Sequence, residues 1–243
     1  MIKFFRKIRQ NLLMENKTGK YFKYAVGEII LVVIGILIAL QINNWNENRK
    51  QSNVIQNYYY QLEEDLADET DNIKDKISRI SESIASYEQY LQLTKESNLE
   101  LIEMMNALTQ VKLAFWYPSF NSNTIGTLES TGDIKLIPAH FRKKLINLVR
   151  KQEGIVSQAN GNYSVYLSDL QKAGNLGFYR NTYHLKENSH LNYTENYPEI
   201  ILTLENALYL KNYTEKRQII ELKQMLNNVN ELKELIKIEI NKK

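Results

Sequence analysis

The apolar run near the N-terminus constrains the fold of this chain more than any other feature. Residues 25–42 read AVGEIILVVIGILIALQI, and the stretch 29–40 contains no polar side chain. As a helix that rises about 1.5 Å per residue, the run would extend roughly 27 Å, which nearly matches the hydrocarbon core of a bilayer. A core helix of a soluble domain normally keeps a polar face, and a cleaved signal peptide would continue with small residues rather than with NNWN at 43–46. The run therefore predicts a transmembrane helix, residues 21–45, that is retained.

The charges around the run predict its orientation. The formal net charge of +3 is unevenly distributed, because basic residues crowd the chain before the run while Glu15 is the one acid there. Soon after the run, only Arg49 and Lys50 are basic. Short flanks rich in Lys and Arg stay in the cytoplasm, so we expect the N-terminus there. The basic residues before the run are Lys3, Arg6, Lys7, Arg9, Lys17, Lys20 and Lys23.

Residues 1–20 predict a cytoplasmic, basic amphipathic segment. Ile2, Phe5, Ile8 and Leu12 would share one face of a helix, with most of the basic side chains on the other faces. Such a helix could lie on the inner leaflet, where each basic residue contributes about 1 kcal/mol near anionic lipid. The same charges could equally serve only to set the topology.

Residues 46–243 predict one extracytoplasmic helical domain. Only 9 glycines and 3 prolines occur in 243 residues, which favours long helices. A heptad-like apolar stripe predicts a helix of about forty to fifty residues that continues from the transmembrane helix and ends near Ser97. The stripe comprises Tyr59, Leu66, Ile73, Ile77, Ile80, Ile84, Tyr87 and Leu91.

The rest of the chain predicts two more long helices and several short elements. One long helix begins at Pro138 and ends near Gly174, and the other follows Pro198 and reaches the C-terminus. The fold class we expect is all-α, with one N-terminal transmembrane helix continuing into an antiparallel bundle of three or four long helices. The short elements are a helix at 99–113, a helix at 124–130 with Gly132 as a left-handed cap, an extended stretch at 134–137 before Pro138, and a long loop at 175–197.

The composition argues against several kinds of chemistry. The chain has no cysteine, which excludes disulfides, thiolate metal sites and a cysteine nucleophile. The main domain is balanced in charge, which argues against nucleic acid as a partner. The acidic run 63–71, EEDLADETD, could supply metal ligands, but it contains no histidine and is more typical of a solvated helix face. Glu187 and His190 form a single Glu-x-x-His pair in the predicted loop. We therefore expect no catalytic, cofactor or metal residues and no enzymatic activity.

The densest aromatic group outside the membrane-proximal tyrosines lies around Pro118. Aromatic side chains in such a connection can plug the end of a bundle, or they can bind a partner. We take this group, with three residues of the long loop, as the first candidate for a recognition surface. Its residues are Phe115, Trp116, Tyr117, Phe120, Tyr179, Tyr183 and His184.

Three stretches of the sequence resemble a known family. They are MIKFFRKIRQNLL, then KYFKYAVGEIILVVIGILIALQINNWNE, and later TLESTGDIKLI. Together they are similar to a domain-of-unknown-function family of bacterial single-pass membrane proteins. The similarity is specific over residues 1–50, weaker over 127–137, and one of architecture elsewhere. It implies a protein of the bacterial inner membrane, with its N-terminus cytoplasmic and its main domain periplasmic, and it transfers no catalytic residue.

Two functional hypotheses follow from this placement. The first is a non-enzymatic extracytoplasmic interaction module, whose partners are the bilayer and either another protein or further copies of the chain. Gly35 and Ala39 would let two transmembrane helices pack closely, although this spacing also occurs by chance. The alternative is a sensor-like subunit that transmits binding through its transmembrane helix to a separate signalling protein, since the cytoplasmic tail is too short for an output domain.

Overall fold

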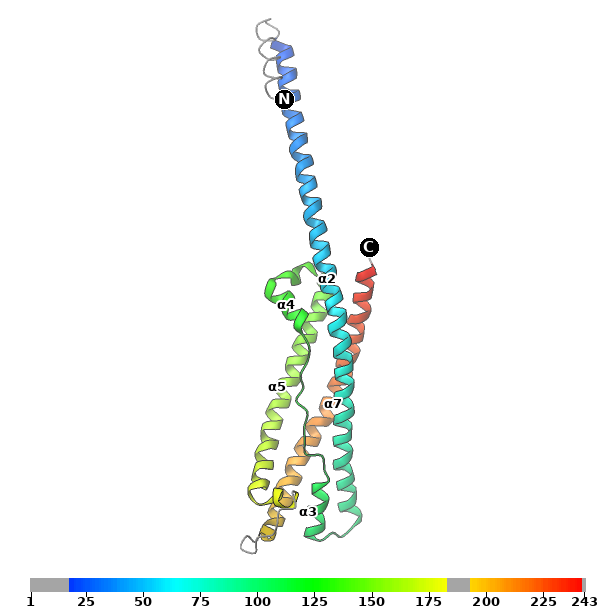
Figure 1. Cartoon of the computed structure of the whole chain (residues 1–243), viewed down its shortest axis with the longest axis vertical. Helices are drawn as coiled ribbons and strands as arrows, with labels where there is room; N and C mark the ends of the chain where they lie inside the picture. The colour runs from blue at the N-terminus through cyan, green and yellow to red at the C-terminus, as the bar shows by residue number, and fades with distance from the viewer. Residues whose placement is uncertain (1–17, 183–192, 242–243) are drawn as a thin grey trace. The chain divides into compact units, whose positions relative to one another are not determined.

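The computed structural model describes residues 18–182 and 193–241, and these fall into two compact units divided between Asn57 and Tyr58. The described residues contain helices, turns and irregular segments and no strand, which confirms the all-α class. Figure 1 shows the order of the elements along the chain. They are α2 (Thr18–Glu96), α3 (Leu101–Thr109), α4 (Asn123–Thr131), the 3-10 helix η1 (Asp133–Leu136), α5 (Ala139–Asn175), α6 (Phe178–Thr182), the 3-10 helix η2 (Tyr193–Asn196) and α7 (Tyr197–Asn241).

The first unit, described from Thr18 onward, is the N-terminal part of α2. Every side chain from Ile29 to Leu40 is exposed, and Leu37, for example, is 58% exposed. This part of α2 is the one described stretch that is long and apolar enough to cross a membrane. Just beyond it, the guanidinium of Arg49 lies 5.5 Å from the ring centre of Trp45. The apolar run therefore forms a helix whose side chains no described part of the chain covers.

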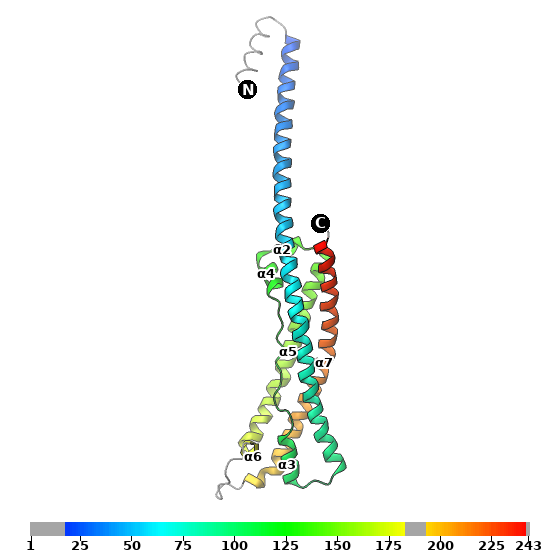
Figure 2. The same cartoon turned by 45° about the vertical axis from the view of Figure 1, so that its right-hand side comes forward.

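The second unit is built on three long helices, namely α2 from Tyr58 onward, α5 and α7 (Figures 1 and 2). Helix α7 runs antiparallel to α5, because Lys144 bonds to Glu231 whereas Tyr163, further along α5, bonds to the earlier residue Gln218. Helix α7 is also antiparallel to α2, because later residues of α2 bond to earlier residues of α7. It follows that α2 and α5 run in the same direction. Two of the α2–α7 bonds show this, namely Ser83 to Glu215 and Tyr90 to Glu205.

Heptad-spaced burial along α2 forms the core of this unit, but the buried positions differ in part from the predicted stripe. Ile77, Ile84 and Leu91 lie at the edge of the core and are half-buried. The core positions predicted for them are occupied instead by the preceding residues, Lys76, Ser83 and Tyr90. These three alternate with the buried apolar residues of α2 at steps of three and four. The buried positions of α2 at this spacing are Tyr59, Leu62, Leu66, Glu69, Ile73, Lys76, Ile80, Ser83, Tyr87 and Tyr90, and Thr70 beside Glu69 is buried as well.

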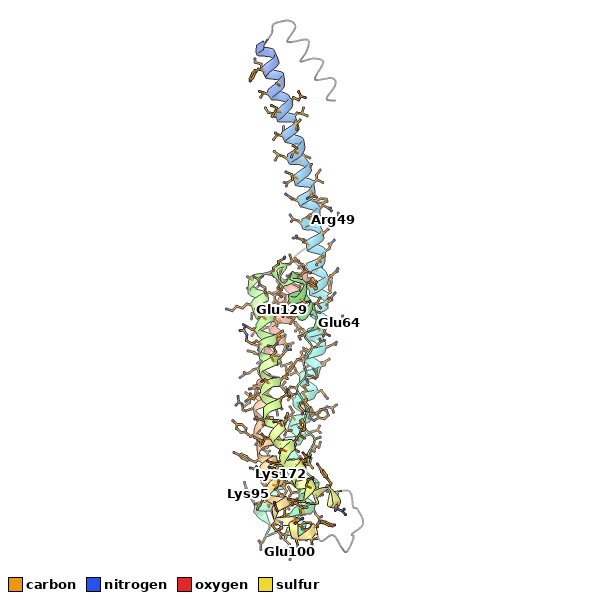
Figure 3. The ribbon with its side chains drawn as sticks, turned by 90° about the vertical axis from the view of Figure 1, so that its left-hand side faces the viewer. Arg49, Glu64, Lys95, Glu100, Glu129 and Lys172 are labelled. Carbon is orange, nitrogen blue, oxygen red and sulfur yellow. The ribbon has the colours of Figure 1, made fainter. Side chains whose placement is uncertain are left out.

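Residues 112–122, which we call the connecting segment, carry the chain from α3 back to α4 beside α2 and α5 (Figures 1 and 2). Figure 3 shows Glu64 and Glu129 at one end of the second unit and Lys95 and Glu100 at the other. The segment has no regular secondary structure. Because it returns the chain along the length of the bundle, α5 can start at the same end as the second-unit part of α2 and run parallel to it. The predicted helix at 99–113 is correspondingly shorter, since α3 ends at Thr109.

The region around Pro138 shows which residues before a proline have a restricted backbone conformation. Gly132 caps α4 with a φ of 76°, which confirms the predicted left-handed cap. The extended stretch predicted at 134–137 is wrong for most of its length, because η1 occupies Asp133–Leu136 and only Ile137 is extended. Proline restricts the residue immediately before it and not the ones further away.

The stretch 175–197, predicted as a long loop, contains ordered elements. The short helix α6 and the 3-10 helix η2 both lie within it. Phe178, at the start of α6, is fully buried and belongs to the same cluster as Tyr87, Leu108 and Leu204. Burial of Phe178 helps to hold this part of the chain on the bundle, together with Leu176 and Tyr193, which pack against the same cluster.

Candidate functional site

The aromatic residues of the connecting segment divide between the two helices that flank it. Phe115 is half-buried against α5, with its ring centre 4.4 Å from that of Tyr163 and 5.9 Å from that of Tyr166. Tyr117 packs edge-on to Phe115 at 4.7 Å and remains 53% exposed. The hydroxyl of Tyr166 donates a 2.6 Å hydrogen bond to the carbonyl of Leu113. Phe115 thus anchors the segment on α5, and Tyr117 covers the anchor from outside.

The other two aromatic residues of the segment face basic side chains of α2. The guanidinium of Arg79 lies 4.5 Å from the ring centre of Trp116, and the ammonium of Lys76 lies 4.7 Å from that of Phe120. Cation–π contacts of this kind contribute about 0.5–1 kcal/mol at exposed sites. Trp116 keeps 39% of its surface exposed. Trp116, Arg79 and Tyr117 are therefore held in place and still open to solvent.

Of the three loop residues predicted for the same surface, the structure describes one. Tyr179 in α6 is 37% exposed, and its ring centre lies 5.6 Å from that of Phe178. Its phenol is one cause of the raised pKa of Tyr166, after desolvation and Glu215. The ring contact of Tyr179 is with Phe178 and not with the aromatic residues of the connecting segment. Tyr183 and His184 lie outside the described residues.

A row of polar side chains on α2 binds the backbone of the connecting segment. Ser86 accepts a hydrogen bond from the backbone N–H of Lys112 at 3.0 Å, and Asp65 accepts one from that of Thr124 at 3.0 Å. Between them, other side chains of the row bond to the backbone at residues 119 and 121. We call this row the docking stripe, and it consists of Asp65, Glu69, Asn72, Lys76 and Ser86.

The spacing of these bonds shows that the segment is largely extended, at about three quarters of its maximum length. The α2 residues from Asp65 to Ser86 rise about 31 Å, at about 1.5 Å each. The segment covers that distance between Lys112 and Thr124, which can span at most about 40 Å. Its backbone groups cannot bond to one another in this conformation, so side chains of α2 satisfy several of them.

The middle of the docking stripe is buried, and this changes its ionisation. Glu69 is fully buried and accepts a 2.9 Å bond from the backbone N–H of Asn121. Desolvation raises the pKa of Glu69, although Asn121, Asn72 and Lys76 each act in the opposite direction. Desolvation likewise lowers the pKa of Lys76, which donates to the carbonyl of Ser119. The acidic run was expected to be a solvated face, and this is wrong for Glu69.

A second buried polar group, which we call the Lys211 cluster, joins α2 to α7. Lys211 donates to Glu215 at 2.7 Å, and Ser83 of α2 donates to the same carboxylate at 3.0 Å. All three side chains are at most 3% exposed. Desolvation lowers the pKa of Lys211 and raises that of Glu215, with their mutual attraction opposing both shifts. One turn further along α7, the hydroxyl of Tyr163 donates a 2.9 Å bond to Gln218.

The sequence of the chain matches the family of unknown function DUF6090 over residues 28–204. The chain belongs to this family. The match begins inside the apolar run, covers the docking stripe and the connecting segment, and ends in α7. No curated protein and no solved structure matches the chain. The expected membership in a family of unknown function is confirmed, whereas the bacterial inner membrane stays an expectation.

In this DUF6090 protein the Lys211 cluster lies in the core between α2 and α7. A lysine beside a serine can act as a base in nucleophilic catalysis, and Lys211 does bond to the hydroxyl of Ser83. A substrate cannot reach this hydroxyl, because Ser83 is only 2% exposed. A buried charge pair with an added hydrogen bond instead favours one pairing of helices over others.

Sequence reasoning missed both buried polar groups of the DUF6090 chain, although a signal was present. Glu69, Lys76 and Ser83 follow one another at seven-residue steps and lie between the apolar positions of the α2 stripe. On α7, Lys211 and Glu215 fall between the buried Leu208 and Leu222 at the same period. Burial of polar side chains at heptad positions therefore had a visible pattern, but only the apolar members were assigned to the core.

Proposed function

We propose that this DUF6090 protein is anchored in a bilayer by the apolar run and presents its helical bundle as an extracytoplasmic protein-interaction module. The observation that carries the anchor is the exposure of every side chain from Ile29 to Leu40. An exposed apolar surface of this extent exceeds the few hundred Å² found on soluble monomers. The basic flank before the run supports a cytoplasmic N-terminus.

The surface proposed for partner recognition is the exposed aromatic pair Trp116 and Tyr117 with Arg79. Trp, Tyr and Arg are the residues that most often dominate binding energy at protein interfaces. Here Trp116 and Tyr117 stand on an extended segment that α2 binds through its side chains and that Phe115 anchors on α5, and Arg79 of α2 lies over the Trp116 ring. A partner would therefore meet side chains whose positions are set before binding, which reduces the entropy lost on association.

Fractionation tests the anchor. We expect the full-length protein to stay in the membrane pellet after alkaline carbonate extraction and to be released by detergent. Ile34→Arg together with Leu37→Arg places two charges in the middle of the run, where each costs about 2.5–3.5 kcal/mol on insertion scales. The double variant should move to the soluble fraction. Quantitative extraction of the unaltered protein by carbonate would refute the anchor.

Site-specific crosslinking tests the recognition surface. A photoreactive amino acid at Tyr117 should give a discrete protein adduct in intact cells, identified by mass spectrometry. Tyr60, an aromatic residue of α2 that is 49% exposed, provides the matched control position and should not give that adduct. Trp116→Ala should abolish the adduct without lowering the thermal unfolding midpoint by more than a few degrees. If Trp116→Ala loses the adduct because the domain unfolds, a recognition role for Trp116 is refuted.

The sensor-like alternative has one supporting observation. Helix α2 is a single element from Thr18 to Glu96, so the apolar run and the docking stripe belong to the same helix. A sensor requires a separate signalling protein as its output. Crosslinks whose yield changes with an added ligand, and which join the chain to a signalling protein, would favour this alternative over a stable interaction module.

A further inference from the structure

The outward face of α7 carries large apolar side chains where a surface helix normally carries polar ones. Leu202 is 68% exposed, Tyr209 65%, Tyr213 51% and Ile220 58%. At about 100° per residue these four lie within about 40° of one another, on the side of α7 opposite the buried Leu204, Leu208 and Leu222. We call the four the outer stripe. Scattered apolar side chains on a surface are common, but a row of four along one helix face marks an interaction site.

The polar residues within the outer stripe are already paired inside the molecule. Asn206 and Lys216 lie between the apolar members, so that the row alternates at steps of four and three as a heptad seam does. The amide of Asn206 donates to Asp169 at 3.4 Å. The ammonium of Lys216 bonds to Glu88 at 2.7 Å. The seam can therefore be covered without leaving an unpaired lysine charge beneath the partner.

We propose that a second copy of this chain covers the outer stripe, with the two α7 helices parallel and in register. Each apolar layer then meets its own counterpart, and Asn206 of one copy faces Asn206 of the other, an arrangement that favours parallel dimers. The parallel direction rests on the proposed membrane anchor, because copies inserted by one orientation rule all point the same way. Confinement to one membrane also raises the effective concentration of one stripe near another.

The area of the stripe fits a reversible dimer. Four side chains that are 51–68% exposed offer roughly 400–500 Å² in each copy, if a large apolar or aromatic side chain contributes about 150–250 Å² when fully exposed. Two copies would bury about 800–1,000 Å² through these side chains, which is in the range of weak and transient interfaces, below about 1,200 Å². An interface of this size forms readily between molecules held in one membrane and only weakly in dilute solution.

The absence of cysteine makes the test direct. Single substitutions Asn206→Cys, Tyr209→Cys and Tyr213→Cys are made in the full-length protein, and membranes are treated with a mild oxidant. In a parallel, in-register dimer the Cα atoms of such pairs approach the about 4.4–6.8 Å that a disulfide requires. We expect a disulfide-linked dimer at each position, with a yield about tenfold above that of the control Tyr60→Cys, which lies on α2 away from the stripe. Equal yields at Tyr60→Cys and at the stripe would overturn the proposal.

Two further measurements keep the outcome unambiguous. Leu202→Cys and Ile220→Cys, expressed together in one cell, should each link to themselves; a predominant Leu202–Ile220 link would indicate an antiparallel pair and overturn the parallel arrangement. Tyr209→Glu with Tyr213→Glu, added to Asn206→Cys, should reduce the linked fraction about tenfold while circular dichroism stays unchanged, because both side chains are exposed. If the stripe cysteines form a disulfide with a different protein, or form none, self-association is also overturned.

Failure of the dimer and failure of the anchor remain distinguishable. If the protein resists carbonate extraction but does not link through the outer stripe, the anchor stands and self-association falls. If the protein is soluble and links through the stripe, self-association stands and both the anchor and the reason for the parallel direction fall. The crosslink is read on a non-reducing gel and the anchor by fractionation, so neither measurement depends on the other.

Discussion

The Lys211 cluster offers the sharpest energetic contrast at the scale of single residues. Lys211 bonds to Glu215 at 2.7 Å with both side chains at most 3% exposed, while Lys144 bonds to Glu231 at the same distance with side chains 46% and 62% exposed. Because the two ion pairs have the same distance, a difference in their contributions to stability reports the effect of burial. An exposed ion pair contributes about 0–1 kcal/mol, whereas loss of one partner of a buried pair costs about 3–5 kcal/mol.

Lys211→Met should therefore lower the free energy of unfolding by about 3–5 kcal/mol, because it leaves the Glu215 carboxylate buried without its cation. Lys144→Met should cost less than about 1 kcal/mol. The double variant Lys211→Met with Glu215→Leu should be more stable than the single one, since no charge remains buried. Urea unfolding of the detergent-solubilised protein, followed by circular dichroism, measures all three. A double variant at or below the stability of the single one would contradict this account.

Glu69 gives a pH dependence with a definite sign. Desolvation raises its pKa in the folded protein, so the folded chain keeps this proton at pH values where the unfolded chain has lost it. The stabilising contribution is complete below the ordinary glutamate pKa of about 4.3 and is lost as the pH rises through the folded pKa. The wild type should thus gain stability relative to Glu69→Gln as the pH falls from neutrality toward the ordinary glutamate pKa. Urea unfolding of the two proteins over this pH range measures the gain; parallel curves for the two proteins would contradict it.

At the scale of secondary-structure elements, the two glycines of α4 test what ends the helix. Gly132 closes the helix with a φ of 76°, and Gly126 lies inside it, with nothing within 4 Å of an added Cβ at either position. Only the backbone conformation distinguishes them. Alanine restricts the unfolded chain at both sites, but at Gly132 it must also adopt a left-handed conformation.

Gly132→Ala should destabilise the protein by about 1–2 kcal/mol, because a Cβ is unfavourable at positive φ. Gly126→Ala should stabilise it by about 0.4–1 kcal/mol, because alanine is the better helix former and meets no steric conflict. Thermal unfolding of the two variants beside the wild type checks both signs. Destabilisation by Gly126→Ala would mean that this face of α4 contacts something outside the chain.

The elements could be predicted from sequence where local rules decide, and not where distant contacts do. Apolar periodicity and proline placement predicted the long helices, the left-handed glycine predicted the end of α4, and the end of α2 at Glu96 agrees with the expected break near Ser97. The stretch around Pro118 was recognised as a connection between helices, but its position beside α2 depends on side chains such as Asp65 and Ser86 that are far from it in sequence. Local propensity carries no information about such partners.

The candidate site shows the same division. The aromatic character of Phe115, Trp116 and Tyr117 was evident, whereas their separation into an α5-facing anchor and a solvent-exposed pair follows from their contacts with Tyr163 and Arg79. The outer stripe on α7 has the heptad spacing that the sequence shows, but only burial reveals which of two apolar faces points outward. Whether these surfaces bind a partner stays a prediction.

The orientation of the whole molecule can be tested with single cysteines, since the chain has none of its own. Asn53→Cys lies beyond the apolar run, and Gly19→Cys lies before it. A membrane-impermeant maleimide added to intact cells with a permeabilised outer membrane should label Asn53→Cys, and it should label Gly19→Cys only after the inner membrane is broken. The reverse pattern would place the bundle in the cytoplasm and contradict the proposed location.

The contacts of the connecting segment predict that it docks late in folding. Its backbone bonds reach side chains 26 to 52 residues earlier in the chain, and its aromatic anchor Phe115 packs on Tyr163 of α5, which follows it in the chain. An extended stretch without local bonds gains nothing until those distant partners are in place, so it docks after the three long helices have met. Substitutions in the segment should accordingly accelerate unfolding and leave the refolding rate almost unchanged. We therefore expect the part of the bundle that displays Trp116 and Tyr117 to form after the three long helices and to open before them.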